Sequence, residues 1–249
     1  MLARLICLLS CCFSFLINAE QELKLTIYTE HFPPYNFISD GQLVGINVEL
    51  TQRVCRHAKI NCKYELLPWS RAYFLAQSQA NSGLISTSRY AAREDKFTWV
   101  GPIAYSDAYL YKLAERTDIA LDKMADARQY TIGMQRNDVY EQVLLSNGFE
   151  KGKNLLELSY KHEEVKLFFS GKLDFIIGSP LTLPYQVAAA GYSIELIKPA
   201  IKLPIEGLQG NYLALNPGYP RELADRLQQS LEELKKDGTV EAIIAKYKK

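Results

Sequence analysis

The chain lacks the features that mark several common classes of protein. Beyond its first twenty residues, it has no second apolar run of membrane-spanning length, and only five cysteines, three histidines and two tryptophans occur in 249 residues. It has no polybasic run, and 29 basic residues nearly balance 28 acidic ones. Such a neutral chain argues against nucleic acid or an anionic membrane as a partner.

Familiar catalytic motifs are missing as well. The sequence has no Gly-x-Ser-x-Gly turn, no phosphate-binding Gly-Lys-Ser/Thr loop and no His-Glu-x-x-His pair. Glu30, His31 and Glu206 are the available acid or base groups, and they form no recognisable catalytic arrangement. We therefore expect no catalytic residue, no metal site and no cofactor.

The first residues are typical of a secretory signal peptide. A positive charge at Arg4 precedes the apolar run Leu5–Ile17, and small Ala19 is followed by acidic Glu20. The run is shorter than the roughly 18–20 residues that a spanning helix needs. We expect cleavage after Ala19, which makes residues 1–19 a signal peptide. A membrane anchor and a lipoprotein signal around Cys11 are the alternatives.

Cleavage leaves two cysteines, Cys55 and Cys62, in the mature chain. An even pair in an exported protein favours a disulfide bond. A metal site built from Cys55, His57 and Cys62 is the alternative, but it has no obvious fourth ligand and no usual paired spacing.

Strand and helix patterns alternate along the mature chain, which is long enough for two lobes of about a hundred residues each. This alternation favours α/β sheets with parallel strands. Loops are predicted at 89–96, 179–180 and 183–184, and extended segments at about 104–112 and 200–208 are expected to cross between lobes. Strands are predicted at 23–28, 63–67, 83–86, 130–134, 173–178 and 194–197. Helices are predicted at 45–57, 68–79, 138–146 and 163–170, through Leu223, Leu227, Leu231 and Leu234, and after Thr239 as the cap.

Several short motifs follow one another in a distinctive order. They are Phe32-Pro33-Pro34-Tyr35, Gly45–Leu50, Pro68-Trp69-Ser70-Arg71-Ala72, Arg89–Phe97, Trp99-Val100-Gly101-Pro102 and Asp237–Tyr247. In this order and spacing, the mature chain resembles the periplasmic solute-binding proteins of polar amino-acid type, called family 3. The resemblance implies a type II periplasmic binding protein, with two α/β lobes joined by two hinge strands. Lobe 1 would comprise 20–108 and 205–249, and lobe 2 would comprise 109–204.

The resemblance also implies a function. A small polar, carboxylate-bearing ligand, an amino acid or a related compound, would be captured in the cleft between the lobes. Closure about the hinge would present it to the membrane permease of an ABC importer. The expected protein is a periplasmic monomer and not an enzyme. An enzyme of cyclic-acid dehydratase type on the same scaffold and a periplasmic ligand sensor for a membrane receptor remain alternatives.

The motifs of lobe 1 carry candidate ligand-binding residues. By resemblance, Trp69 packs against the ligand and Tyr35 closes over it. Arg93 is expected to form a bidentate pair with the ligand carboxylate, and its neighbour Arg89 is the alternative for the same role. Tyr90 stands where the family usually has threonine. Further contacts are expected from Arg71, Ser86 and Ser88.

Lobe 2 contributes fewer candidates. The predicted junction of a strand and a helix at Gly133–Asp138 offers backbone amides suited to an anion, with Arg136 and Asn137 as contacts. Ser179 stands where amino-acid binders of the family carry an aspartate for the ligand's α-ammonium group. Serine cannot supply that charge, so a carboxylate-bearing ligand is a safer expectation than an amino acid, unless Glu206 substitutes.

Overall fold

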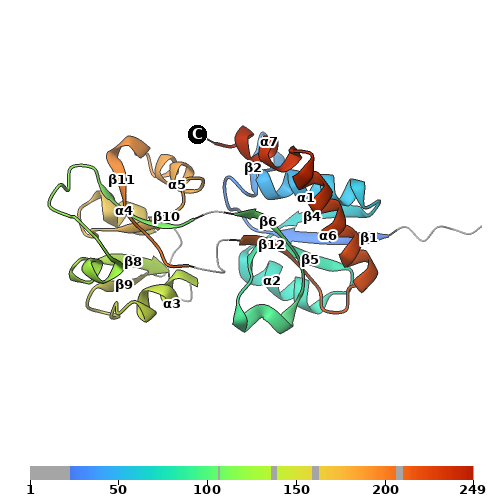
Figure 1. The fold of residues 1–249 in the computed structure, drawn as a ribbon, viewed down its shortest axis with the longest axis horizontal. Helices are drawn as coiled ribbons and strands as arrows, with labels where there is room; N and C mark the ends of the chain where they lie inside the picture. The colour runs from blue at the N-terminus through green and yellow to red at the C-terminus, as the bar shows by residue number, and fades with distance from the viewer. Residues whose placement is uncertain (1–22, 106, 136–138, 159–162, 206–209, 249) are drawn as a thin grey trace, which may run out of the picture.

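The computed structural model describes residues 23–105, 107–135, 139–158, 163–205 and 210–248. Two lobes lie side by side, and the chain passes between them twice (Figure 1). Lobe 1 contains residues 23–105 and 210–248, and lobe 2 contains the described part of 107–205. This is the architecture predicted from the sequence, although the exact domain boundaries of 108/109 and 204/205 stay predictions.

A five-stranded sheet forms the centre of lobe 1, in the order β4-β1-β5-β12-β6. The strands β1 (Lys24–Thr29), β4 (Asn61–Leu66) and β5 (Ser82–Ser88) are parallel. In contrast, β12 (Gly210–Leu215) runs antiparallel to β5 and to β6 (Thr98–Tyr105). The expectation of parallel strands is therefore wrong for β12. It runs against both neighbours because β6 leads towards lobe 2 and β12 returns from it.

Helices cover both faces of this sheet (Figure 1). On one face lie α1 (Ile46–His57), α6 (Arg221–Lys236) and α7 (Thr239–Lys246), and on the other lies α2 (Trp69–Ser78). Alternate strand residues point to opposite faces, so Ile85 packs with α1 and α6 while its neighbour Leu84 packs with α2.

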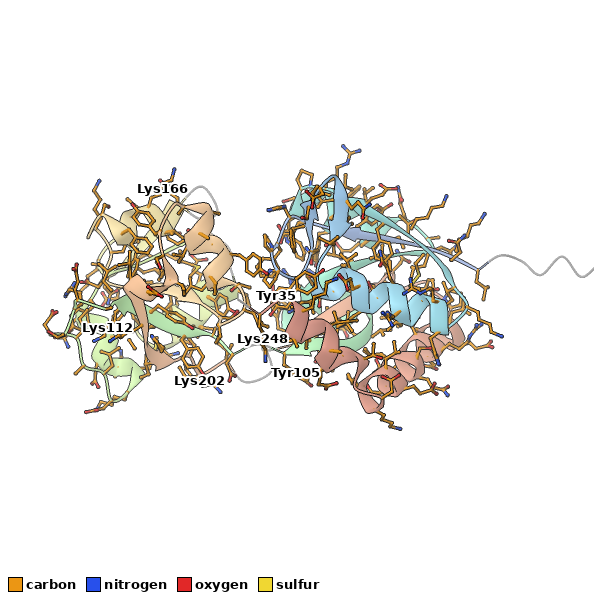
Figure 2. The ribbon with its side chains drawn as sticks, turned by 90° about the horizontal axis from the view of Figure 1, so that it is seen from above. Tyr35, Tyr105, Lys112, Lys166, Lys202 and Lys248 are labelled. Atoms are coloured by element: carbon orange, nitrogen blue, oxygen red, sulfur yellow. A yellow bond between two sulfur atoms is a disulfide. The ribbon has the colours of Figure 1, made fainter. Side chains whose placement is uncertain are left out.

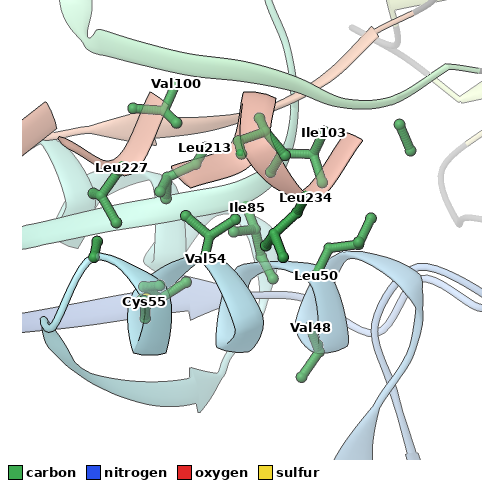
Figure 3. Close-up of a cluster of buried hydrophobic side chains, with 14 of the residues drawn as sticks. Val48, Leu50, Val54, Cys55, Ile85, Val100, Ile103, Leu213, Leu227 and Leu234 are labelled. Carbon is green, nitrogen blue, oxygen red and sulfur yellow. The ribbon is translucent and has the colours of Figure 1, made fainter. Parts of the chain in front are cut away.

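The leucine stripe predicted on the long amphipathic helix is confirmed in α6. Leu227 and Leu231 are fully buried. Figure 3 shows Leu227 and Leu234 of α6 together with Leu50 and Val54 of α1, in the cluster of buried side chains over the sheet. The 3.6-residue period of the stripe explains why this helix was recognisable from the sequence.

Lobe 2 is built around two smaller sheets. The first is antiparallel, with β10 (Ile176–Gly178) and β11 (Ile197–Lys202) on either side of β7 (Tyr109–Leu113). The second pairs β8 (Ile132–Gln135) with β9 (Leu155–Leu158) in parallel. Their helices are α3 (Val139–Ser146), α4 (Glu163–Phe169) and α5 (Leu183–Ala189), with a 3₁₀ helix η2 at Met124–Gln129.

Three local predictions in lobe 2 and at the last helix are wrong. Leu183-Pro184 was expected in a loop but begins α5, since proline is tolerated in a first helical turn, where its missing N–H has no partner to lose. The strand expected at 194–197 begins as a 3₁₀ helix, η3 (Ile194–Leu196), before β11. Thr239 is not the cap of α7, which starts after Gly238 in the left-handed conformation, with φ of 80°.

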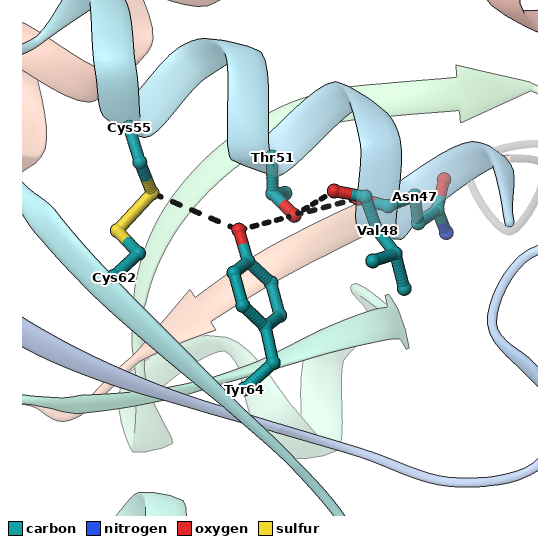
Figure 4. The surroundings of a disulfide bond; sticks show 6 residues. All are labelled: Asn47, Val48, Thr51, Cys55, Cys62 and Tyr64. Atoms are coloured by element: carbon teal, nitrogen blue, oxygen red, sulfur yellow. Dashed lines mark hydrogen bonds between the residues drawn. A yellow bond between two sulfur atoms is a disulfide. The ribbon is translucent and has the colours of Figure 1, made fainter. Parts of the chain in front are cut away.

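The predicted disulfide joins Cys55 of α1 to Cys62 of β4 (Figure 4). Beside it, the hydroxyl of Tyr64 donates a hydrogen bond to Thr51 Oγ1 at 3.1 Å. The disulfide therefore fastens the end of α1 to β4, an edge strand of the sheet.

The disulfide removes both thiolates from the alternative metal site. His57, the third proposed ligand, instead faces α6. Its Nδ1 lies 3.2 Å from Ser230 Oγ and its Nε2 lies 3.3 Å from Glu233 Oε2. Within the described ranges, no group of three histidine, cysteine or acidic side chains is placed to hold a metal ion. Nor does any helix of these ranges have the length and apolar character needed to cross a membrane.

The lobes touch each other beside their two chain connections. The hydroxyl of Tyr185 in α5 donates to the carbonyl oxygen of Tyr247 at 3.1 Å. The ring of Phe37 lies 6.1 Å from that of Tyr185 and 6.2 Å from that of Tyr247. Tyr247 is also fixed within lobe 1, because its Oη accepts the amide of Gly45 at 3.1 Å. Figure 2 shows the next residue, Lys248, at the side of lobe 1 that faces lobe 2.

Candidate functional site

The segments that carry the predicted lobe 1 contacts meet at one edge of the sheet. Tyr35 lies in the segment after β1, Trp69 follows β4, and Arg89 and Arg93 follow β5. The carboxyl ends of parallel strands share an edge, and ligands of open α/β sheets bind outside that edge. The topology therefore gathers these residues, which are far apart in the sequence.

A hollow of about 290 Å³ opens between two of these segments, the start of α2 and the segment that follows β5. Trp69 begins α2, and Tyr73 follows one helical turn later with its ring 5.9 Å from that of Trp69. The segment after β5 was predicted as a charged loop, but it forms a 3₁₀ helix, η1 (Ala91–Lys96), which places Arg93 in the wall. The lining consists of Trp69, Ser70, Tyr73, Tyr90, Ala92, Arg93 and Lys96.

Aromatic rings hold the Arg93 guanidinium. Its Cζ lies 4.8 Å from the ring centre of Tyr90 and 5.4 Å from those of both Trp69 and Tyr73. Its Nη1 donates to the carbonyl oxygen of Ser88 at 3.3 Å. Among the described residues, no carboxylate forms an ion pair with it. The cation is thus oriented by cation–π contacts, while N–H donors remain for an anion.

Arg89 has very different surroundings. It forms a bidentate pair with Glu94, with Nε 2.8 Å from Oε2 and Nη2 bonded to Oε1. These hydrogen bonds raise the pKa of Arg89 and lower the pKa of Glu94. The guanidinium also lies 5.7 Å from the ring centre of Trp99 and 5.9 Å from that of Tyr212. Arg89 therefore has a carboxylate partner inside the protein, unlike Arg93.

Ser86 and Tyr35 lie deeper in lobe 1. Ser86 has a left-handed backbone, with φ of 61°. Its Oγ accepts from Asn47 Nδ2 at 2.8 Å and donates to Asn36, and both asparagines are fully buried. Tyr35 is 1 % exposed and packs in the core, with its ring 5.2 Å from that of Phe32. Figure 2 shows Tyr35 on the side of lobe 1 that faces lobe 2.

The last two predicted ligand contacts of lobe 1, Arg71 and Ser88, differ in how they relate to the hollow. Arg71 is exposed on α2 and does not line the hollow, whereas Ser88 touches Arg93 through its carbonyl group. The ligand-binding roles of Arg71, Ser88, Ser86 and Tyr35 stay predictions.

In lobe 2, Ser179 is buried at the start of the turn that leads into α5. Its Oγ accepts the backbone N–H of Thr182 at 3.0 Å and lies 2.9 Å from Thr182 Oγ1. The hydroxyl is thus engaged within its own turn, which gives it a local structural role. Arg136, Asn137 and Glu206 lie outside the described residues.

Of the seven lining residues, the sequence predicted Trp69 and Arg93 as ligand contacts and missed the other five, which are Ser70, Tyr73, Tyr90, Ala92 and Lys96. Tyr73 was recoverable, because residues four apart on a helix share a face and Trp69 was already a candidate. Lys96 gave no comparable signal, since it is one of several charged residues in its segment.

Tyr73 also belongs to a row of aromatic rings. After Trp69 and Tyr73, the row continues through Phe97, Trp99 and Tyr212. The ring centres are 5.3 Å apart for Tyr73 and Phe97, 5.5 Å for Phe97 and Trp99, and 5.8 Å for Trp99 and Tyr212. Arg93 lies at one end of this row and Arg89 at the other. The row connects the hollow to the outer strands of the sheet.

Comparison with known proteins gives similar sequences and similar folds. The chain is 22 % identical to the "Probable amino-acid-binding protein YxeM" of Bacillus subtilis (strain 168) over 219 residues, which are 86 % of this chain and 79 % of that protein. Its fold resembles a histidine kinase sensor domain similar to periplasmic binding proteins, with a TM-score of 0.75, 21 % identity and coverage of 92 % and 97 % of the two chains.

A second solved structure is similar over a comparable length. It is an arginine 3rd transport system periplasmic binding protein from Legionella pneumophila, with a TM-score of 0.72, 20 % identity and coverage of 90 % and 99 %. At identities this low the structural similarity shows a shared fold alone, and that fold is the type II periplasmic-binding-protein architecture predicted from the sequence. The family description "Bacterial extracellular solute-binding proteins, family 3" matches residues 25–249. Because this match covers both lobes and most of the chain, the protein belongs to the bacterial extracellular solute-binding proteins of family 3.

Proposed function

We propose that the protein captures a small polar, carboxylate-bearing ligand, an amino acid or a related compound, between its two lobes. The observation that carries this proposal is Arg93, which lies in the wall of the hollow without a carboxylate partner among the described residues. A guanidinium presents parallel N–H donors that match the two oxygens of a carboxylate. The adjoining rings of Trp69, Tyr73 and Tyr90 would shelter the apolar part of such a ligand from water.

The proposed role is delivery of this ligand, in the periplasm, to the membrane permease of an ABC importer. The family assignment supports it, as do the amino-acid-binding relative and the periplasmic neighbour from an arginine transport system. The predicted signal peptide and the extracellular family support a periplasmic location. The protein would act as a monomer.

The protein would bind its ligand without changing it. The described lining of the hollow contains no carboxylate and no imidazole, the usual acid and base groups of an enzyme. The family assignment also favours binding over the cyclic-acid dehydratase alternative.

A ligand sensor for a membrane receptor is the second candidate function. The similarity in fold to a histidine kinase sensor domain, at a TM-score of 0.75, favours it. Both functions require the same capture of a ligand, so the binding experiment comes first. Radiolabelled uptake in cells with and without the protein would then separate import from sensing.

The ligand class can be tested by a thermal-shift screen of the mature chain against amino acids, small carboxylic acids, polyamines and short peptides. A compound at a hundred times its dissociation constant should stabilise the protein by about 2.7 kcal/mol. Amino acids as hits would mean that a group other than Ser179 faces the ammonium. Hits only among other carboxylic acids would make Ser179 a mark of altered specificity. Silence across the panel would contradict the proposal.

Arg93→Ala tests the residue that carries the proposal. We expect the affinity for any carboxylate hit to fall by about 2 kcal/mol, roughly thirtyfold, because a charge-assisted bidentate pair is lost. Arg221→Ala is the matched control, since Arg221 is an exposed arginine on α6 that pairs only with Asp225 in the described structure. Calorimetric titration measures both variants. Wild-type affinity in Arg93→Ala would exclude Arg93 from the binding site.

A further inference from the structure

Two arginines of one short segment have opposite surroundings, and the residue that separates their roles is Glu94. Arg93 contacts aromatic rings and a carbonyl oxygen, whereas Arg89 holds both carboxylate oxygens of Glu94. Yet Glu94 is the residue directly after Arg93 in the chain. The acidic group nearest to Arg93 along the chain is therefore paired with a different arginine.

This arrangement matters for an anionic ligand. Neighbouring Cα atoms are about 3.8 Å apart, so an unrestrained Glu94 side chain would stay within reach of the Arg93 guanidinium. The Glu94 carboxylate would then either pair with the Arg93 guanidinium or repel the carboxylate of an approaching ligand, because two negative charges close together interact unfavourably. The Arg89 pair neutralises Glu94 and holds it away from this competition.

Arg89 and Glu94 are themselves held in place by the aromatic row. The indole Nε1 of Trp99 donates to the backbone carbonyl of Glu94 at 3.0 Å. The Arg89 guanidinium lies over Trp99 and Tyr212. Both partners are partly exposed, with 41 % and 44 % of their side-chain surface accessible. Exposed ion pairs add about 1 kcal/mol or less to stability, and this pair also holds the carboxylate that directly follows Arg93 in the chain.

We propose that Arg89 is a positioning residue of the ligand site, which sequesters Glu94 so that Arg93 stays available to an anionic ligand. The proposal rests on the proposed function, because it gives Arg93 the ligand. Arg89 then contacts no ligand, in contrast to the direct role that the sequence left open for it.

The test uses phenylglyoxal, a reagent specific for arginine, as a probe that needs no ligand. The reagent attacks the deprotonated guanidine, and a carboxylate partner disfavours that form by stabilising the cation. Modification of Arg93 is followed over time in the mature protein by peptide mass spectrometry, for the wild type and the variants Arg89→Gln, Glu94→Gln, Arg89→Gln/Glu94→Gln and Arg89→Lys.

We expect Arg93 in Arg89→Gln to react more slowly than in the wild type by about twofold to fivefold, the range that an exposed ion pair produces. The double variant should restore the wild-type rate, and Arg89→Lys should stay close to it. Arg221→Gln, which releases Asp225 on α6 in the same way, should leave the rate unchanged. An unchanged rate in Arg89→Gln, or a slower rate that the double variant does not restore, would overturn the proposal.

A purely structural role gives a different pattern. Loosening of the segment would expose Arg93 and speed its modification, and loss of Glu94 as well would not reverse the change. The outcome is also separable from that of the proposed function. If Arg93→Ala weakens ligand binding while the reactivity pattern is absent, only the role of Arg89 fails. If Arg93→Ala leaves ligand binding intact, Arg93 is excluded from the site and the role of Arg89 falls with it, whereas the proposed function itself fails only if no ligand of the panel binds.

Discussion

Arg89 and Arg93 come from the same charged segment, and the sequence marked both as candidates for one role. Their separation depends on what each side chain meets in the fold: Glu94 for Arg89, and the rings of Trp69 and Tyr73 for Arg93. Residue type and spacing predicted that an arginine belongs here. They could not choose between the two, because the choice depends on partners from α2 and from the turn of η1.

Asp174 shows how surroundings set the charge of a single residue in lobe 2. Its Oδ1 accepts from Arg116 Nη1 at 2.7 Å, and its Oδ2 accepts from the backbone N–H of Thr131 at 2.8 Å and from Thr131 Oγ1 at 2.9 Å. Burial by itself would raise the pKa of Asp174, but these hydrogen bonds lower it overall. A lowered folded-state pKa means that the stabilisation is fully present above the unfolded value of about 3.9 and is lost as pH falls through the folded value.

We therefore expect Asp174→Asn to destabilise the protein by about 2 kcal/mol at neutral pH, since hydrogen bonds to a charged group are lost. Urea unfolding at a series of pH values measures this difference, which should shrink below about pH 4 as the wild-type carboxylate takes up its proton. Asp225→Asn, at an exposed position on α6, should change little at any pH. A difference that stays constant down to low pH would show that the charge of Asp174 is not its source.

At the scale of elements, Gly45 determines how α1 begins. The amides of Ile46 and Asn47 donate to the carbonyl oxygens of Pro34 and Tyr35 at 2.9 and 3.0 Å, so the Pro-Pro segment lies against the start of the helix. Gly45 has φ of 128°, and a Cβ at this position would lie 2.4 Å from the Tyr35 carbonyl oxygen. Only glycine permits this approach.

Gly45→Ala should therefore lower the free energy of unfolding by more than an alanine whose only penalty is a positive φ. Gly41→Ala is the matched control, because Gly41 also has a positive φ, of 74°, but a Cβ there would meet nothing within 4 Å. We expect Gly41→Ala to cost about 1 kcal/mol and Gly45→Ala clearly more, as strain and collision combine. Thermal unfolding of both variants measures the difference. Equal losses would mean that the backbone at Tyr35 moves aside easily.

The elements differ in how well the sequence predicted them. The long helix α6 was recognisable because its leucines repeat at helical spacing. The short strand β9 (Leu155–Leu158) was not predicted, because its register depends on pairing with β8. Likewise, α5 was hidden by Pro184, which suggests a loop as readily as a helix start.

At the scale of the whole molecule, the Tyr185–Tyr247 contact joins the lobes beside the two chain connections. Motif order could predict two lobes, but it could not predict this contact, which joins residues 62 positions apart through one hydroxyl group and a backbone carbonyl. Any rotation of one lobe against the other must alter it. It therefore contributes to the arrangement of the lobes seen here.

Tyr185→Phe removes the hydrogen bond and keeps the ring. We expect the distribution of distances between the lobes of the ligand-free protein to broaden or shift, while the unfolding midpoint changes little. Pulsed electron paramagnetic resonance between spin labels at Lys166→Cys and Glu222→Cys measures the distribution. Tyr192→Phe is the control, since Tyr192 is an exposed lobe 2 tyrosine stacked on Phe169. Identical distributions in wild type and Tyr185→Phe would show that the bond does not influence the lobes.

The aromatic row from Trp69 to Tyr212 also gives the protein an optical property. Neighbouring ring centres in the row lie 5.3 to 5.9 Å apart, so the near-ultraviolet signal of each ring depends on its neighbours. Both tryptophans of the chain belong to it. A molecule that enters the hollow would touch Trp69, the first member, and the perturbation would appear in the near-ultraviolet circular dichroism of the whole row. The protein thus contains its own label-free reporter of occupancy.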